Sequence, residues 1–139
     1  MQVLVDTSVW SLVLRRRTEA LNPLKKGIAA ELASLIDEGR AQLIGPIRQE
    51  ILSGIRGPAQ YSLLRADLSG FEDEPLQSPD FEFAAQLSNR CRTAGVAGSP
   101  VDFLICAVAL KRNWPVFTAD RDFLAYAKLL AVKLHSPRG

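Results

Sequence analysis

Four short, mostly apolar runs along the chain predict buried β-strands. They cover residues 2–5, 41–44, 116–118 and 131–134. Runs of this kind, without regular polar alternation, are typical of strands that are buried on both faces of a parallel sheet. Residues 71–76 carry three consecutive acids and suggest a loop or an edge strand.

Amphipathic segments with recognisable start signals separate these strands. Asn22-Pro23, Ser78-Pro79 and Ser99-Pro100 each combine a capping residue with a proline in the first helical turn, and Ser8 can cap the first helix. The predicted helices cover residues 8–14, 23–39, 45–57, 58–68, 79–95, 100–113 and 123–130. Strands that alternate with helices predict an α/β fold, with a central parallel sheet of four to five strands covered by helices on both faces.

Length and composition indicate one globular domain, residues 1–139, with a sizeable core, because 47% of the residues are apolar. The net charge of only +2 gives no global basic field, so any nucleic-acid binding must use local patches. Cys91 and Cys106 fall in apolar helical patterns and are expected to be buried free thiols, which suits a reducing cytoplasm. We find no signal peptide and no apolar run long enough for a membrane span.

The candidate chemistry lies in four acids. Asp6, Asp102 and Asp120 each follow a predicted strand or open the next helix, and Glu50 lies one turn into the helix after the second strand. Because the carboxyl ends of parallel strands share one edge of a sheet, we expect all four carboxylates to converge there. Such a cluster would repel itself, and a hard divalent cation, Mg²⁺ or Mn²⁺, would remove that conflict.

Each acid taken alone has a structural explanation. Asp6 could cap the first helix, Asp102 completes a capping box with Ser99, Asp120 sits in a turn, and Glu50 could be a solvated helix residue. Other chemistries lack their signatures. The chain has a single histidine, and it has no nucleophile elbow, no Walker P-loop and no dinucleotide-binding glycine motif.

Four segments together resemble the successive motifs of PIN domains, most closely those of VapC toxins from type II toxin–antitoxin modules. They are Val5-Asp6-Thr7-Ser8-Val9-Trp10, Glu50, residues 101–107 and residues 117–123. The resemblance implies a three-layer α/β/α fold in which Asp6, Glu50, Asp102 and Asp120 bind Mg²⁺ or Mn²⁺. It further implies that Thr7, Ser8 and Thr118 help to position the metal or its water, and that Asp122 is a supporting acid.

The expected function is therefore a metal-dependent endoribonuclease that acts as a toxin and inhibits translation or growth. Its expected partners are RNA, a VapB-like antitoxin and a second copy of the chain. Basic residues near the acidic edge are expected to bind the phosphates, namely Arg15, Arg16, Arg17, Arg48 and Arg121. Two alternatives stay open at this point: a PIN-like nuclease of RNA maturation without an antitoxin, and a non-catalytic metal-binding α/β interaction domain.

Overall fold

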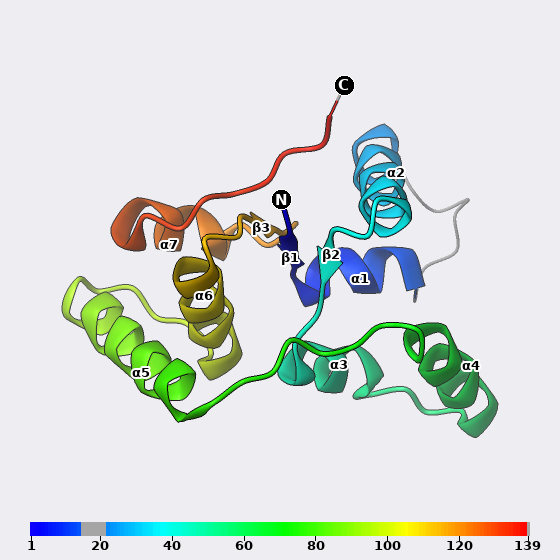
Figure 1. Ribbon diagram of the computed structural model, residues 1–139, viewed down its shortest axis with the longest axis horizontal. Coiled ribbons are helices and arrows are strands. Elements are labelled where there is room, and N and C mark those ends of the chain that lie inside the picture. The colour runs from blue at the N-terminus through cyan, green and yellow to red at the C-terminus, as the bar shows by residue number, and fades with distance from the viewer. Residues whose placement is uncertain (15–21, 139) are drawn as a thin grey trace.

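The computed structural model describes residues 1–14 and 22–138 of the chain. Strands and helices alternate through these parts (Figure 1). The elements are β1 (Val3–Val5), α1 (Thr7–Leu14), α2 (Pro23–Asp37), β2 (Ala41–Gln42), α3 (Gly45–Leu52), α4 (Pro58–Leu68), α5 (Ser78–Thr93), α6 (Pro100–Arg112), β3 (Val116–Phe117) and α7 (Asp122–Leu130). Among these helices, none combines the length and apolar character that crossing a membrane requires.

The strands form one parallel sheet in the order β2-β1-β3, so the first strand of the chain is the central one. In this register Leu4 of β1 lies opposite Gln42 on one side and Val116 on the other. All three residues of β1 are completely buried. The apolar run at the start of the chain is therefore a central strand, as its lack of polar alternation predicts.

The sheet is smaller than the four to five strands expected from the sequence. Within the described residues, the two expected outer strands are reduced to single bridges, Leu43 with Asp73 and Val116 with Leu134. The bridge at Leu43 cannot extend into a longer ladder, because the chain already turns into α3 at Gly45. Residues 133–135 run beside β3, but they contribute only two backbone hydrogen bonds, Val116 N to Lys133 O and His135 N to Val116 O.

Helices cover both faces of the sheet and give three layers. Figure 1 shows α2 on one face and α6, with α5 beside it, on the other. Helix α7 lies on the side of α5 and α6, because it contacts α5 and its Tyr126 ring packs on Phe103 of α6. Helix α6 packs against both α5 and the sheet, and every residue from Phe103 to Ala109 is consequently buried. The start of α6, which carries Asp102, is thereby fixed to the centre of the core.

Two of the predicted helix starts are confirmed and two differ. Asn22 caps α2 by accepting a hydrogen bond from Lys25 N (2.9 Å), and Ser99 caps α6. Helix α1 instead begins at Thr7, so Ser8 lies inside it. The N-cap of α5 is Gln77, one residue before the expected Ser78.

The two cysteines are buried and free, as the sequence predicts. Burial raises the pKa of both the Cys91 and the Cys106 thiol. Both side chains therefore stay protonated near neutral pH and act as small apolar groups of the core.

One charged cluster ties α5 to the end of α6. The Asp80 side chain is almost completely buried, and its Oδ1 lies 3.0 Å from Arg112 Nη1 and 3.1 Å from Lys111 Nζ. Its Oδ2 accepts a hydrogen bond from Gln77 N (2.9 Å). Arg112 also bonds Glu74 and the Pro75 carbonyl, so it fixes the segment before α5. The hydrogen bonds from Arg112 hold the pKa of Asp80 far below its usual range, against the opposing effect of burial.

We expect Asp80→Asn to lower the free energy of unfolding by about 2 kcal/mol or more at pH 7, because it leaves Arg112 without its buried partner. The folded-state pKa of Asp80 lies below the unfolded value of about 3.9. The stabilisation is therefore complete above about pH 5 and is lost as the pH falls below 4. Urea titrations at pH 7 and pH 3 should show the difference between wild type and variant shrinking in acid. Asp67→Asn, on the exposed side of α4, should change stability little at either pH.

Candidate active site

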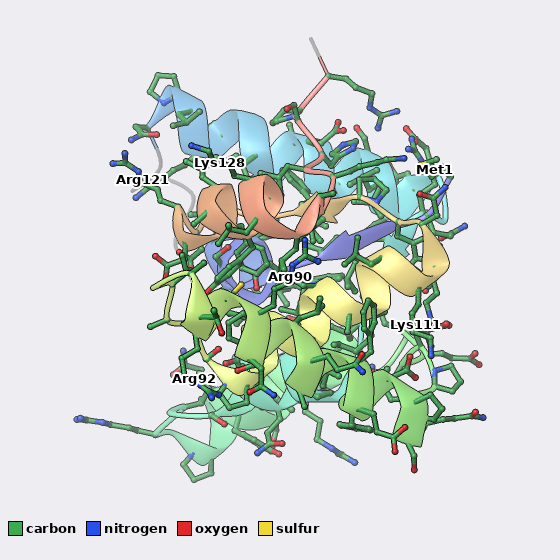
Figure 2. The ribbon with its side chains drawn as sticks, turned by 90° about the vertical axis from the view of Figure 1, so that its left-hand side faces the viewer. Met1, Arg90, Arg92, Lys111, Arg121 and Lys128 are labelled. Atoms are coloured by element: carbon green, nitrogen blue, oxygen red, sulfur yellow. The ribbon has the colours of Figure 1, made fainter. Side chains whose placement is uncertain are left out.

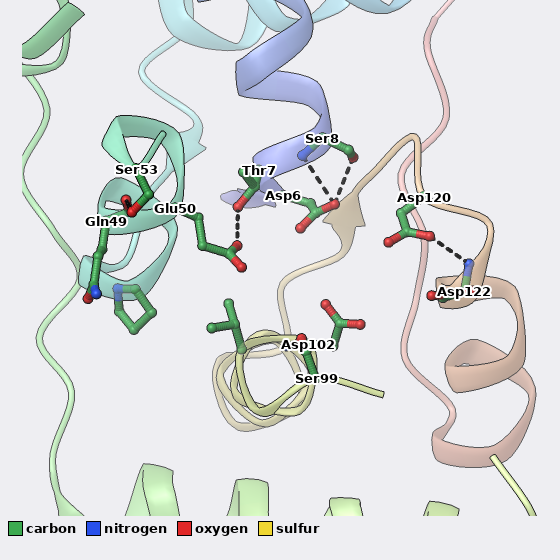
Figure 3. Close-up of a pocket in the computed structure, with 12 residues that line it drawn as sticks. Asp6, Thr7, Ser8, Gln49, Glu50, Ser53, Ser99, Asp102, Asp120 and Asp122 are labelled. Atoms are coloured by element: carbon green, nitrogen blue, oxygen red, sulfur yellow. Dashed lines mark hydrogen bonds between the residues drawn. The ribbon is translucent and has the colours of Figure 1, made fainter. Parts of the chain in front are cut away.

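A cleft of about 700 Å³ opens at the carboxyl edge of the sheet, and carboxylates dominate its wall (Figure 3). It lies among the ends of β1 and β3 and the first turns of α1, α6 and α7, with α3 opposite. Its lining residues are Asp6, Thr7, Ser8, Pro46, Gln49, Glu50, Ser53, Ser99, Val101, Asp102, Asp120 and Asp122. Of the expected site residues that the structure describes, only Thr118, Arg48 and Arg121 are absent from this wall.

Asp6 stands at the end of the central strand and is only 5% exposed. Its Oδ2 accepts hydrogen bonds from the hydroxyls of Ser8 (2.7 Å) and Thr118 (2.8 Å). Its backbone N donates to Phe117 O (2.8 Å), which continues the β1–β3 pairing. The other carboxylate oxygen points into the cleft (Figure 3). Asp6 is thus a fixed acceptor held by two hydroxyls, with one oxygen left for a ligand.

The hydroxyls of Ser8 and Thr118 join the first motif to the last. Each hydroxyl donates a hydrogen bond to Asp6 and accepts one from a backbone N–H. Ala119 N donates to Ser8 Oγ (2.9 Å), and Asp120 N donates to Thr118 Oγ1 (3.0 Å). This use of the Ser8 hydroxyl explains why Ser8 is not the cap of α1. The two side chains position Asp6 and the turn that carries Asp120.

Asp102 lies in the first turn of α6, where only half of the expected capping box forms. Its backbone N donates to Ser99 Oγ (3.1 Å), but its carboxylate accepts from the Tyr126 hydroxyl (2.8 Å) instead of from the N-cap. Burial raises the pKa of Asp102, and the negative charges of Asp6 and Asp120 raise it further, against the bonds from Tyr126 and Ser99. A cation in the cleft would reverse the effect of these negative neighbours.

Asp120 and Asp122 belong to one turn before α7. Asp120 Oδ1 accepts a hydrogen bond from Asp122 N (2.9 Å), which fixes the turn. One carboxylate oxygen from each of Asp102, Asp120 and Asp122 lies within 4.8 Å of the other two. Asp122, expected only as a supporting acid, therefore belongs to the tightest group of carboxylates in the described residues.

Glu50 faces this group from α3, on the opposite wall of the cleft (Figure 3). The Thr7 hydroxyl donates to Glu50 Oε1 (2.6 Å), which connects the first motif to α3. Glu50 is exposed, and no described residue bonds its other oxygen. Its position is that of a carboxylate free to act on a molecule in the cleft.

The expected phosphate-binding arginines fall into three situations. Arg48 does not line the cleft: its guanidinium donates to Asp73 Oδ1 (2.9 Å), Leu68 O (3.0 Å) and Phe71 O (2.6 Å) and so holds the segment after α4. Arg121 is exposed, between the two aspartates of its turn. Arg15, Arg16 and Arg17 lie outside the described residues.

Tyr126 is the site residue that the sequence analysis missed. Its ring is completely buried between Phe103 and Phe123, and its hydroxyl reaches Asp102. Burial raises the pKa of Tyr126, and the bond to Asp102 adds to the rise. A buried tyrosine needs a partner for its hydroxyl, and that requirement was the available signal. Gly98 leaves room for this hydroxyl, since an added Cβ would overlap it and the Phe103 ring.

The donor set of the cleft suits a hard divalent cation. The described lining residues contribute carboxylate and hydroxyl oxygens, and none of them is a lysine, arginine, histidine or cysteine. Mg²⁺ and Mn²⁺ prefer such oxygen ligands. Burial raises the pKa of Asp102, and the negative charges of Asp6 and Asp120 add to the rise. A cation in the cleft would stabilise the charged carboxylates against both effects.

Several known proteins are similar to this chain in sequence or fold. The family model of the PIN domain matches residues 3–129. A crystal structure of FitAcB from Neisseria gonorrhoeae is 25% identical, with a TM-score of 0.75 and coverage of 98% of each chain. VapBC-5 from Mycobacterium tuberculosis, of the VapBC family of toxin–antitoxin systems, is 22% identical, with a TM-score of 0.65 and coverage of 96% of each chain.

A third similar structure is VapBC2 from Rickettsia felis bound to a DNA fragment from its promoter. It is 13% identical, has a TM-score of 0.71, and is matched over 97% of this chain and 98% of its own. The two structures below 25% identity show likeness of fold alone. No curated protein sequence matches the chain.

Tyr126→Phe should cost about 1.5–3 kcal/mol in the free energy of unfolding, because it removes a hydrogen bond to a charged group and leaves Asp102 less satisfied. The pKa of Asp102 should rise, since the bond from Tyr126 lowers it in the wild type. Urea unfolding and NMR titration of the aspartate carboxyl carbons measure the two effects. Tyr61→Phe is the matched control, because that ring is 40% exposed and its hydroxyl has no described partner. Equal behaviour of the two variants would contradict the role given to Tyr126.

Proposed function

Since the chain belongs to the PIN domain family, we propose that it is a metal-dependent endoribonuclease that hydrolyses RNA phosphodiester bonds. The observation that carries the proposal is the cleft lined by five carboxylates and, among the described residues, by no cationic side chain. Such a cleft repels a phosphate unless a metal ion neutralises it.

The proposed cofactor is Mg²⁺ or Mn²⁺, held by Asp102, Asp120 and Asp122 together with Asp6. The first three supply oxygens within 4.8 Å of one another, and Asp6 keeps one oxygen free toward the cleft. When bound, such a cation supplies charge neutralisation for the phosphate and activation of water.

The residues of the chain then have separate tasks. Ser8 and Thr118 keep Asp6 oriented, and Tyr126 does the same for Asp102. Glu50, held by Thr7 at one oxygen, uses its other oxygen to accept the proton of the attacking water. The water oxygen joins the phosphorus as a P–O bond of the RNA breaks, and the leaving oxygen takes a proton from solvent, which leaves one phosphate end and one hydroxyl end.

We also propose that the chain is the toxin of a type II toxin–antitoxin module. The support is the likeness, over nearly the whole chain, to the FitAcB and VapBC structures. The proposed partners are a VapB-like antitoxin that blocks the cleft, and a second copy of the chain. Exposed apolar side chains such as Leu24 and Leu63 offer contact surface for these partners.

RNA hydrolysis should require Mg²⁺ or Mn²⁺ and stop in excess EDTA. Asp120→Asn should lower kcat by about 100-fold or more, because it removes a negative ligand of the ion. Folding should be preserved, since asparagine keeps the Oδ1 acceptor for Asp122 N and relieves repulsion. Rates on a fluorogenic RNA, with Asp67→Asn as the control for charge, test this. Full activity in EDTA would exclude the proposed mechanism.

Expression of the chain alone should arrest growth, and co-expression of the neighbouring small open reading frame should restore it. Asp120→Asn should be harmless, because the toxic effect is attributed to hydrolysis. Growth curves, together with co-purification of the two products, measure both effects. A harmless wild-type chain that still cuts RNA would support a nuclease of RNA maturation instead.

A further inference from the structure

Four cationic side chains gather on the side of the molecule formed by the end of α5 and by α7. Figure 2 faces this side and labels Arg90 and Arg92 on α5, with Arg121 and Lys128 on or beside α7. We call these four residues the α5–α7 basic face. All four are exposed.

The charges of this face are not neutralised locally. In the parts of the chain that the structure describes, none of the four side chains forms an ion pair, whereas Lys111 and Arg112 are both bound to Asp80. Residues 83–101 and 123–138 contain no aspartate or glutamate. The surface around Arg90, Arg92 and Lys128 therefore carries no acid from these two ranges, and the nearest acids in sequence to Arg121 are the cleft residues Asp120 and Asp122.

The basic face adjoins the acidic cleft. Arg121 lies between Asp120 and Asp122 in sequence, and both of these acids line the cleft. Figure 2 shows Arg121 and Arg92 on the side opposite to Met1. Since Met1 marks the amino end of β1, the two arginines lie at its carboxyl end, where the cleft opens.

The geometry of α5 spreads its two arginines apart. Cys91 between them is completely buried, so Arg90 and Arg92 project to the two flanks of the helix. Arg90 lies between Arg92 and Lys128 in Figure 2. The four cations thus cover a broad surface instead of forming one compact anion pocket, and such a surface fits a chain of phosphates better than a single small anion.

We propose that the α5–α7 basic face binds the backbone phosphates of single-stranded RNA and leads the strand into the acidic cleft. The inference rests on the proposed nuclease function and names the surface that supplies its substrate affinity. A polyanion gains nothing from a cleft lined by carboxylates until a neighbouring surface attracts it. The contribution of each cation should be independent of base identity, because phosphates carry no sequence information.

A structural role for Arg90, Arg92 and Lys128 makes a different prediction. All three lie in the last turn of a helix, where a cation stabilises the helix dipole. A purely structural role would change thermal stability and leave RNA affinity unaltered. RNA affinity and its salt dependence therefore separate the two roles.

The test is the binding of fluorescein-labelled oligouridylates of 15 and 3 nucleotides, measured by anisotropy in EDTA so that no RNA is cut. The double variant Arg90→Gln/Arg92→Gln should bind the 15-mer several-fold more weakly. The slope of log Kd against log [NaCl] should fall by about 1.4, at about 0.7 for each lost phosphate contact. Binding of the 3-mer should change much less, because it cannot span the face. Lys128→Gln is a second variant, with half the expected change in slope.

Arg56→Gln/Arg65→Gln is the matched control. It removes the same charge from exposed positions beside and on α4, which Figure 1 places away from α5 and α7. An equal effect of both double variants, or unchanged RNA binding with a lowered melting temperature, would overturn the proposal. So would loss of antitoxin binding with RNA binding intact, which would make the face a protein interface. RNA binding that depends on the α5–α7 basic face, without cleavage in Mg²⁺ or Mn²⁺, would support RNA binding by this face and reject the nuclease function.

Discussion

The bond between the Asp6 carboxylate and the hydroxyls of Ser8 and Thr118 is the contact on which the site depends. Asp6 follows the central strand and Thr118 follows its neighbour β3, so the hydrogen bond between them joins the carboxyl ends of the two strands. Each hydroxyl also accepts a backbone N–H from the turn that leads to α7. The geometry of Asp120 and Asp122 is consequently determined by a residue more than a hundred positions earlier in the chain. The same hydrogen bonds therefore join the ends of the strands and order the acidic cleft.

The acids on the remaining wall of the cleft are held by other contacts. Asp102 is carried by the most deeply buried helix and is oriented by a buried tyrosine, whereas Glu50 is exposed and held by Thr7 alone. Asp6 and Asp102, two of the carboxylates that would share a cation, are thus attached to the core, and the carboxylate proposed to take a proton stands apart from them.

Local sequence signals predicted the parts of the fold that depend on neighbours in the chain. The buried run before Asp6, the cap-and-proline start at Asn22 and the acids after the strands all have short-range causes. The outer strands were over-predicted, because pairing depends on whether a partner segment, such as that before Pro75, can extend alongside. Arg48 was expected near phosphates, but it satisfies carbonyls of a segment about 20 residues away. Contacts of this kind have no local signature. A tyrosine in an apolar helical pattern indicates that its hydroxyl needs a partner, but it does not indicate that the partner of Tyr126 is Asp102.

The continuous burial of α6 also bears on how the domain opens. Amide hydrogens in a helix packed on two sides exchange with solvent only when the surrounding core separates. For the stretch from Phe103 to Ala109, that event amounts to unfolding of the whole domain. The first turn of the same helix carries Asp102, so we expect the acidic cleft to be attached to a part of the molecule whose amide hydrogens exchange slowly. We therefore expect local unfolding elsewhere in the domain to leave this wall of the cleft in place. Proteolytic cleavage, which needs an unfolded segment, is not expected within α6.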